Sequence, residues 1–304
     1  MPKLVSVIIP NINRCGLLEK CLDGVFWQSY KPVEVIVIDN ASTDGAPEMV
    51  RSKFPQVQLI ENKTNIGAAE ARNQGIRLSK GAYLWFLDND SLCEDNGVLQ
   101  RMVDYLEGHP DAGCAGGELR YDGNGNCIGV KGFDIRPNGE AVMKIHSCEG
   151  VCECDYFDTL NLLARRDIVY GIGGFDSYYI YLAEDKDLCF KIKKSGYKIV
   201  VDREFGVRHF RSDEKRPPSN AYRRLLQRNR LRFVLLNCGW EQIPLAPAYD
   251  FAPFFNPRRF LIEGGPLFFG KLRAQAYAYW WNILNLPRTL CLRFEKKQFL
   301  NITR

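Results

Sequence analysis

Residues 35–45 read Val35-Ile36-Val37-Ile38-Asp39-Asn40-Ala41-Ser42-Thr43-Asp44-Gly45, an apolar run that ends in polar residues. A short run of β-branched residues predicts a buried strand. The polar side chains of Thr43 and Asp44 suit the positive end of a helix that follows. A strand that leads through a polar turn into a helix is the repeating unit of α/β proteins. The stretch therefore predicts an α/β fold.

The same unit recurs along the first third of the chain. Further apolar runs cover residues 4–9, 57–60 and 83–87, and apolar residues at helical spacing cover 14–27 and 68–80. Strands that alternate with helices in this way form mostly parallel sheets. We therefore expect a central, mostly parallel sheet with helices packed against it.

Polar residues end three of these strands, namely Pro10-Asn11, Asp39-Asn40 and Asp88-Asn89-Asp90. Because open parallel sheets bind ligands beyond the carboxyl ends of their strands, we expect a ligand site at this edge. Asp88 and Asp90 form a D-x-D pair whose oxygens suit a hard divalent cation. The three-residue pattern alone also fits a solvated turn, so both interpretations stay open on this evidence.

The composition is that of an ordinary folded protein. Of 304 residues, 46% are hydrophobic and 25% are charged, which argues against disorder and predicts about two domains. The sequence contains no signal peptide and no apolar segment long enough to span a membrane, so we expect a cytoplasmic protein. Its 11 cysteines are an odd number and favour a reducing compartment. Cys148, Cys152 and Cys154 lack a paired C-x2-C array, so a zinc site is not favoured and their role stays open.

Charge is divided unevenly along the chain. Residues 1–202 hold 22 basic against 29 acidic residues, a net charge of −7, whereas residues 203–304 hold 19 against 7, a net charge of +12. A basic segment indicates an anionic partner, but no nucleic-acid-binding motif occurs, so no nucleic acid is expected. Aromatic residues among the basic ones fit peripheral contact with the inner membrane face. They fit a helical pair packed on the rest of the protein almost equally well.

The second half of the chain predicts further elements. They are an antiparallel flap over 108–150, a helix over 184–195, a strand over 197–201, a basic helix over 220–236, a Pro-rich linker over 244–257 and an amphipathic segment over 266–286.

Six motifs occur in a fixed order along the chain. They are Val5-Ser6-Val7-Ile8-Ile9-Pro10, the stretch 35–45, Asn65-Ile66-Gly67 with Ala71-Arg72-Asn73-Gln74-Gly75-Ile76, Leu87-Asp88-Asn89-Asp90, Gly173-Gly174-Phe175-Asp176, and Glu184-Asp185-Lys186-Asp187-Leu188-Cys189. Together they resemble the family 2 glycosyltransferases of GT-A fold, in particular the rhamnosyltransferase-like branch, over about residues 3–215. The resemblance implies a Rossmann-like nucleotide-diphospho-sugar transferase sandwich with a C-terminal helical extension.

The resemblance implies a division of labour along the chain. Residues 1–215 would form the catalytic domain, with a nucleotide-sugar-binding half at about 1–110 and an acceptor-binding half at about 111–215. Residues 216–304 would form a basic, aromatic helical extension. The implied reaction is inverting transfer of one sugar from a UDP-, dTDP- or GDP-linked donor to a hydroxyl of a glycan or lipid-linked acceptor. It would use Mg²⁺ or Mn²⁺ and serve cell-surface polysaccharide or glycoconjugate biosynthesis.

The resemblance also assigns roles to individual residues. The implied donor-binding residues are Pro10, Asn11, Asp39, Asn40, Arg72, Asp88 and Asn89. The implied metal ligands are Asp90, Asp88 and His209. The glycine that usually follows the last of these is absent here, so a metal ligand and a buried structural histidine are both open.

The same resemblance implies that Asp185 is the base that takes the proton of the acceptor hydroxyl, with Glu184 in support. From the residues alone, acidic side chains at a helix start also fit simple complementation of the helix dipole. The Gly-Gly-Phe-Asp turn precedes this pair at the family spacing, which favours the catalytic interpretation.

Two departures from the family pattern are informative. Asp158-Thr159-Leu160-Asn161 stands where relatives often have a small Gly-Ala pair, so the acceptor pocket is expected to be unusual. Gln227-Arg228-Asn229-Arg230 lacks the tryptophan of the processive Q-x-x-R-W element, which favours transfer of a single sugar.

The sequence argues against two rival functions and leaves a third as an alternative. A nucleotidyltransferase should show a Gly-rich phosphate loop after the first strand, and a dinucleotide oxidoreductase should show G-x-G-x-x-G, and neither occurs. A non-catalytic sugar-nucleotide sensor or scaffold is the alternative from another class. It would have no need of a base such as Asp185.

Overall fold

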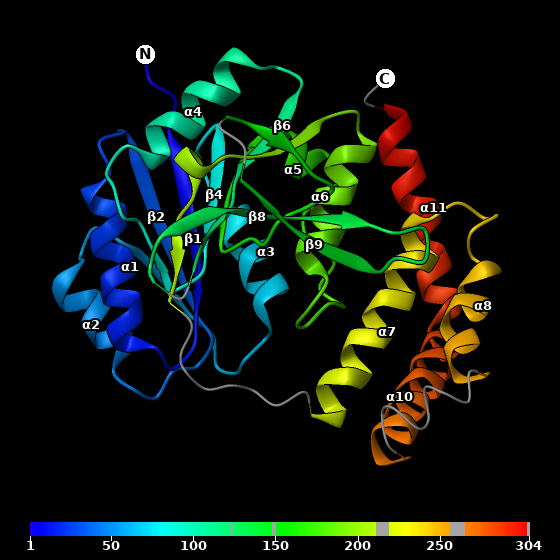
Figure 1. Cartoon of the computed structure of the whole chain (residues 1–304). Coiled ribbons are helices and arrows are strands. Elements are labelled where there is room, and N and C mark those ends of the chain that lie inside the picture. Colours follow the sequence, from blue (N-terminus) through cyan, green and yellow to red (C-terminus); the bar gives the residue numbers. More distant parts are fainter. Residues whose placement is uncertain (123, 148–149, 211–218, 256–264, 303–304) are drawn as a thin grey trace. The chain divides into compact units, whose positions relative to one another are not determined.

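The computed structural model describes residues 1–122, 124–147, 150–210, 219–255 and 265–302 (Figure 1). The helices are α1 (Cys15–Trp27), α2 (Ala46–Lys53), α3 (Ala68–Leu78), α4 (Val98–Gly108), α5 (Arg166–Gly171), α6 (Glu184–Lys194), η1 (Arg203–Phe205), α7 (Asn220–Asn237), α8 (Leu245–Phe251), η2 (Ala252–Phe255), α10 (Gly265–Leu284) and α11 (Leu286–Ile302). The strands are β1 (Val5–Asn11), β2 (Val33–Asp39), β3 (Gln58–Glu61), β4 (Tyr83–Leu87), β5 (Ser91–Leu92), β6 (Ala112–Gly116), β7 (Glu118–Tyr121), β8 (Cys127–Ile135), β9 (Ala141–His146), β10 (Cys152–Glu153), β11 (Asn161–Arg165), β12 (Lys198–Val201) and β13 (Arg208–His209).

The chain forms two compact units. Unit 1 comprises Met1–Asp134, Met143–Ile180 and Glu184–Ser212, and unit 2 comprises Ile135–Val142, Tyr181–Ala183 and Asp213–Arg304. The domain boundary predicted between residues 215 and 216 lies outside the described residues.

Unit 1 is built on an eight-stranded sheet with the order β10-β12-β6-β11-β4-β1-β2-β3. The pairs β1/β2, β1/β4, β2/β3 and β6/β12 are parallel, whereas β11 runs antiparallel to both of its neighbours. The four strands predicted from the apolar runs are β1 to β4, and their parallel pairing is confirmed.

Helices cover both faces of this sheet because successive strand residues point to opposite sides. On one face, Val5, Val7 and Ile9 pack in a buried cluster with apolar residues of α1, α2 and α4. On the other face, Gly75 of α3 approaches the sheet so closely that a Cβ there would lie 2.4 Å from the side chain of Ile8. Figure 1 shows α1 and α2 beside β1 and β2.

The predicted flap over residues 108–150 is only partly correct. Residues 112–116 form β6, a fully buried strand of the large sheet, and only β7, β8 and β9 form a separate three-stranded sheet. The sequence of β6, Ala-Gly-Cys-Ala-Gly, contains no large apolar residue, because α6 packs directly on it: a Cβ at Gly113 would lie 2.5 Å from Ile192. Small side chains thus concealed a core strand. Helix α4 was also missed.

Unit 2 is helical. Helix α7 begins after Ser219, whose hydroxyl accepts a hydrogen bond from the backbone N–H of Tyr222. Asp250 of α8 accepts hydrogen bonds from Arg230 of α7 and from Gln275 and Tyr279 of α10, which ties three helices together. The predicted Pro-rich linker over 244–257 is therefore wrong for residues 245–251, which are helical after Pro244 at the N-cap. In the parts of the chain that the structure describes, no helix is both long and apolar enough to cross a membrane.

One described cysteine differs from what a reducing compartment favours. Nine of the described cysteines are free thiols, and Cys152 in the short strand β10 is disulfide-bonded. Cys148 lies outside the described residues, and Cys154 is a buried free thiol. A metal site at this cluster finds no support among the described residues, where no suitable group of three ligands occurs.

Candidate active site

The carboxyl ends of β1, β2 and β4 meet at one edge of the sheet, as the sequence predicts. Strand register places Asn11 opposite Asp39. The Asn11 Nδ2 atom donates to Asp39 Oδ2 at 2.9 Å, and Asn89 Nδ2 donates to Asn11 Oδ1 at 2.6 Å. The polar strand ends therefore form one connected layer. Pro10 precedes this layer in β1 and is half-buried.

Asp39 and Asn40 fix the turns around this layer. The Asp39 carboxylate is 1% exposed and also accepts hydrogen bonds from the backbone N–H and the hydroxyl of Ser42, at 2.8 and 2.6 Å. Asn40 Oδ1 accepts from Asn62 at 3.0 Å. Both Asp39 oxygens thus have donors within the protein, and the donor-binding role of these two residues stays a prediction.

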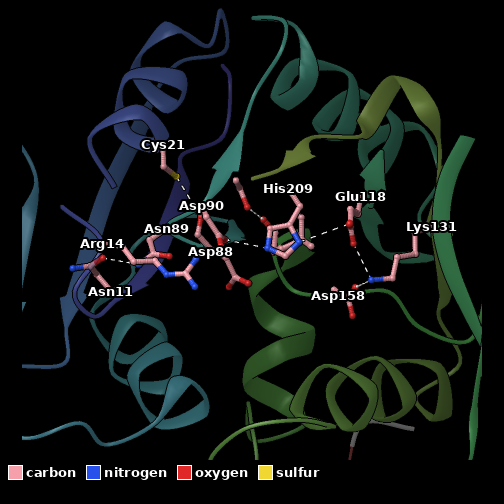
Figure 2. A network of polar contacts seen from close by, with 12 residues as sticks. Asn11, Arg14, Cys21, Asp88, Asn89, Asp90, Glu118, Lys131, Asp158 and His209 are labelled. Carbon is pink, nitrogen blue, oxygen red and sulfur yellow. Dashed lines mark hydrogen bonds and ion pairs between the residues drawn. The ribbon is translucent and has the colours of Figure 1, made fainter. Parts of the chain in front are cut away.

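Asp90 lies between two cationic side chains (Figure 2). Arg14, at the N-cap of α1, donates to Asp90 Oδ2, and His209 Nε2 lies 3.2 Å from Asp90 Oδ1. The contact with His209 follows from the small β5/β13 sheet, in which His209 pairs with Ser91, the residue after Asp90. Pairing of β5 with β13 thus brings His209 to Asp90, about 120 positions away in the sequence.

A series of side chains with alternating charge runs from His209 through Glu118 and Lys131 to Asp158. His209 Nδ1 lies 3.7 Å from Glu118 Oε1, Glu118 Oε2 accepts from Lys131 Nζ at 2.8 Å, and Lys131 also pairs with Asp158 (Figure 2). Burial alone would lower the pKa of His209, but the carboxylates of Asp90 and Glu118 outweigh it and raise that pKa to about 9. Burial opposes ionisation of Asp90 as well, yet His209 and Arg14 hold its pKa below the ordinary value.

A second group of carboxylates surrounds Arg72 of α3. The guanidinium is almost fully buried and lies 2.6 Å from Asp88, 3.5 Å from Glu184 and 3.9 Å from Asp185. Three carboxylates therefore share one cation. The structure thus places Arg72 against the residues predicted as the base and its support.

Asp185 lies in the first turn of α6 and keeps a 20% exposed side chain. The Thr159 hydroxyl donates to Asp185 Oδ1 at 2.5 Å. Desolvation and the neighbouring Glu184 carboxylate raise the pKa of Asp185 well above its ordinary value, although Arg72 and Thr159 act in the opposite direction. Glu184 is more deeply buried, and its Oε2 atom has no hydrogen-bond partner in the described structure. The arrangement gives one partly exposed carboxylate with a raised proton affinity.

The residues at Asp90 fit a divalent cation in part. The 3.2 Å between Asp90 Oδ1 and His209 Nε2 is close to the spacing of two adjacent ligands of an octahedral ion with bonds of roughly 2.1–2.2 Å. Asp88 differs, since its Oδ1 atom accepts a hydrogen bond from Arg72. Within the described ranges no group of three or more His, Cys, Asp or Glu side chains is placed to hold a metal ion. The structure therefore assembles two of the three predicted ligands.

Sequence reasoning missed several members of these clusters. Arg14 carried a usable signal, because it follows the polar end of β1 by three residues. Glu118 and Lys131 carried none, since they meet across the β7/β8 hairpin and belong to no local motif. Thr159 was noted only as part of a departure from the family pattern, and its contact with Asp185 gives that departure a physical meaning.

The chain is similar to known glycosyltransferases in sequence and in fold. Residues 6–144 match the family model Glycosyl transferase family 2. Glycosyltransferase AglE of Haloferax volcanii is 32% identical over 182 residues, which cover 58% of this chain and 57% of AglE. The amylovoran biosynthesis glycosyltransferase AmsB of Erwinia amylovora is 30% identical over 207 residues, which cover 64% of this chain and 66% of AmsB. The chain thus spans 57% of the length of AglE and 66% of the length of AmsB.

Two solved structures resemble the fold. The mannosyltransferase PcManGT from Pyrobaculum calidifontis, in complex with GDP-Man and Mn²⁺, superposes with a TM-score of 0.56 at 20% identity and covers 94% of this chain and 88% of its own. S. aureus TarS 1–349 gives a TM-score of 0.56 at 17% identity and covers 91% and 81%. The predicted GT-A fold with a C-terminal helical part is confirmed. The family match and the curated relatives show that the chain carries a glycosyl transferase family 2 domain.

Proposed function

We propose that the protein is an inverting glycosyltransferase that moves one sugar from a nucleotide-diphospho-sugar to a hydroxyl of a glycan or lipid-linked acceptor. The observation that carries this proposal is Asp185, a partly exposed carboxylate with raised proton affinity, next to a sheet edge lined by Asn11, Asp88 and Asp90. A base with a raised pKa takes a hydroxyl proton more effectively than an ordinary aspartate does.

In the proposed reaction Asp185 accepts the proton of the acceptor hydroxyl as that oxygen attacks the anomeric carbon. The bond from that carbon to the diphosphate breaks on the opposite face, so the configuration inverts and a nucleoside diphosphate leaves. Thr159 holds one Asp185 oxygen, which leaves the other for the proton. Arg72 keeps Asp88, Glu184 and Asp185 together in spite of their like charges.

Donor binding is proposed at the edge formed by Pro10, Asn11, Asp39, Asn40 and Asn89, with Arg72 and Asp88 beside it. Asp90 and His209 would hold Mg²⁺ or Mn²⁺, with Asp88 near them, and such an ion neutralises the charge of a diphosphate leaving group. The complex of the structural neighbour PcManGT with GDP-Man and Mn²⁺ supports this assignment. A UDP-, dTDP- or GDP-linked hexose or rhamnose is the proposed donor, and cell-surface polysaccharide or glycoconjugate synthesis the proposed role.

The test is donor hydrolysis and binding across UDP-, dTDP- and GDP-sugars with Mn²⁺ or Mg²⁺. Wild type, Asp185→Asn and Asp90→Ala are compared with Asp23→Asn, which alters an exposed aspartate of α1. We expect slow, metal-dependent release of one nucleoside diphosphate. Asp185→Asn should reduce it about 10²- to 10⁴-fold, Asp90→Ala should weaken metal and donor binding, and Asp23→Asn should behave as wild type. Donor binding that Asp185→Asn leaves unaltered, with no turnover even when extracts that supply acceptors are added, would instead favour a non-catalytic sensor.

We further propose that unit 2 contacts an anionic membrane surface. One face of α10 exposes Phe269, Trp280, Ile283 and Leu284, which recur at helical spacing together with the exposed Arg273. Aromatic residues that alternate with cations suit the headgroup layer, and the charge of +12 over residues 203–304 complements anionic lipid. A lipid-linked acceptor would be presented at such a surface.

Sedimentation with vesicles tests this contact. We expect binding to vesicles that contain phosphatidylglycerol, at low salt, and loss of binding in the double variant Trp280→Ser, Ile283→Ser. Trp27→Ser is the matched control, because Trp27 of α1 is 53% exposed in unit 1. Wild-type protein that stays in the supernatant with anionic vesicles would contradict the proposal.

A further inference from the structure

The segment directly before the proposed base has a conformation that is rare for its residues. Leu182 and Ala183 have φ angles of 70° and 74°, in the left-handed region that disfavours side chains with a Cβ. Such residues persist only where their surroundings hold them. Glu184 and Asp185 follow Ala183 directly in the chain, at the start of α6. The direction in which α6 begins therefore depends on this segment.

One buried side chain holds the segment in place. Asn229 of α7 is fully buried, and its Nδ2 atom donates to the carbonyl oxygens of Tyr181 at 2.8 Å and of Leu182 at 2.7 Å. Its Oδ1 atom accepts from Arg228 Nε at 2.9 Å, which fixes the orientation of the amide. An amide has only two N–H donors, and both are used on consecutive carbonyls of the strained segment.

We propose that Asn229 is a positioning residue for the reaction. It holds the carbonyls of Tyr181 and Leu182, which keeps Leu182 and Ala183 in the left-handed conformation and so sets the place of Asp185 at the start of α6. The inference rests on the proposed role of Asp185 as the base. Asn229 itself does not enter the chemistry. A displacement of the base by about 1 Å is enough to reduce a rate about a hundredfold, so the contact is expected to affect turnover more than ligand binding.

Unit 2 offers a matched control for a merely structural role. Asn282 of α10 is 1% exposed, and its Nδ2 atom likewise donates to two backbone carbonyls, those of Arg228 at 3.0 Å and Ala278 at 2.8 Å. Neither carbonyl belongs to the segment before Asp185. Removal of either amide leaves two backbone carbonyls without these donors and is expected to lower stability to a similar extent.

The test compares Asn229→Ala with Asn282→Ala in the full chain. We expect Asn229→Ala to lower kcat at least about tenfold, with nucleoside diphosphate affinity changed less than about twofold, and Asn282→Ala to keep kcat within about twofold of wild type. Ala183→Gly added to Asn229→Ala should recover part of the lost kcat, because glycine adopts the left-handed conformation without steric penalty. If Asn229→Ala does not fold, Asn229→Ser, which keeps one donor, takes its place.

Amide hydrogen exchange gives a readout that does not depend on turnover. Peptides that cover residues 180–188 should exchange faster in the Asn229 variant than in wild type or in Asn282→Ala. Equal kcat in the two variants, or unchanged exchange over 180–188, overturns the proposal. If wild type turns over no nucleotide sugar, yet these peptides loosen only in the Asn229 variant, the proposed function fails while the positioning contact stands.

Discussion

Asp90 and Asp185 are aspartates of one candidate site whose surroundings act on them in opposite ways. Asp90 is 8% exposed and lies between Arg14 and His209, and its pKa is lowered. Asp185 is 20% exposed and lies beside Glu184, and its pKa is raised. Burial by itself disfavours ionisation of both. Because burial acts in the same direction on both carboxylates, the opposite signs of the two shifts come from the charges nearby.

The number of cations per carboxylate explains the difference. At Asp90 two cationic side chains face one carboxylate, whereas Arg72 alone serves Asp88, Glu184 and Asp185. The first region keeps its carboxylate ionised, and the second keeps a carboxylate that readily accepts a proton. Paired groups with pKa values pushed apart in this way are typical of sites that separate charge binding from proton transfer.

Of the variants considered, Arg72→Met should have the largest effect, and this effect is on stability. It leaves three carboxylates without their shared cation, and we expect a loss of about 3–5 kcal/mol in the free energy of unfolding at pH 8. The loss should shrink at pH 5, where protonation removes part of the repulsion. Urea unfolding measures both. Arg77→Met is the control on the same helix, since Arg77 is 58% exposed in its pair with Glu70, and the pair should contribute less than about 1 kcal/mol. Equal losses in the two variants would contradict the shared-cation account.

The two regions also show which strands and which side-chain contacts can be predicted from the sequence. Large apolar runs predict β1 to β4, and their polar ends predict the layer of Asn11, Asp39 and Asn89, because parallel strands bring such ends together. Strand β6 escaped because its residues are small. Some contacts of the two aspartates also escaped, because they join positions far apart in the chain. Arg14 and Asp90 are 76 residues apart, and Thr159 and Asp185 are 26 apart.

A smaller effect on stability is expected from the titration of His209 in the metal-free protein. Its pKa of about 9 in the folded state lies above the ordinary value of about 6.5. The stability that its protonation contributes is therefore fully present below about pH 6.5 and lost as the pH rises to about 9, up to about 3 kcal/mol in all. Urea unfolding in EDTA across this interval measures the slope. His209→Gln should flatten it, and an unchanged slope in that variant would assign the pH dependence to other groups.

Thr159→Val should produce the smallest effect and sharpen the comparison at Asp185 itself. The Thr159 hydroxyl lowers the pKa of Asp185 by a hydrogen bond to its ionised form, so its removal should raise that pKa further. The acidic limb of the kcat profile should then move to higher pH, because Asp185 would lose its proton, and so become able to act as the proposed base, only at a higher pH. One hydrogen bond to a charged group is worth about 1.5–3 kcal/mol, so kcat should fall about tenfold or more at acidic pH and less at alkaline pH. Thr159→Ser keeps the hydroxyl and should keep the profile. Equal shifts of the profile in Thr159→Val and Thr159→Ser would show that the hydroxyl does not set the pKa of Asp185. The shape of the side chain would then be responsible.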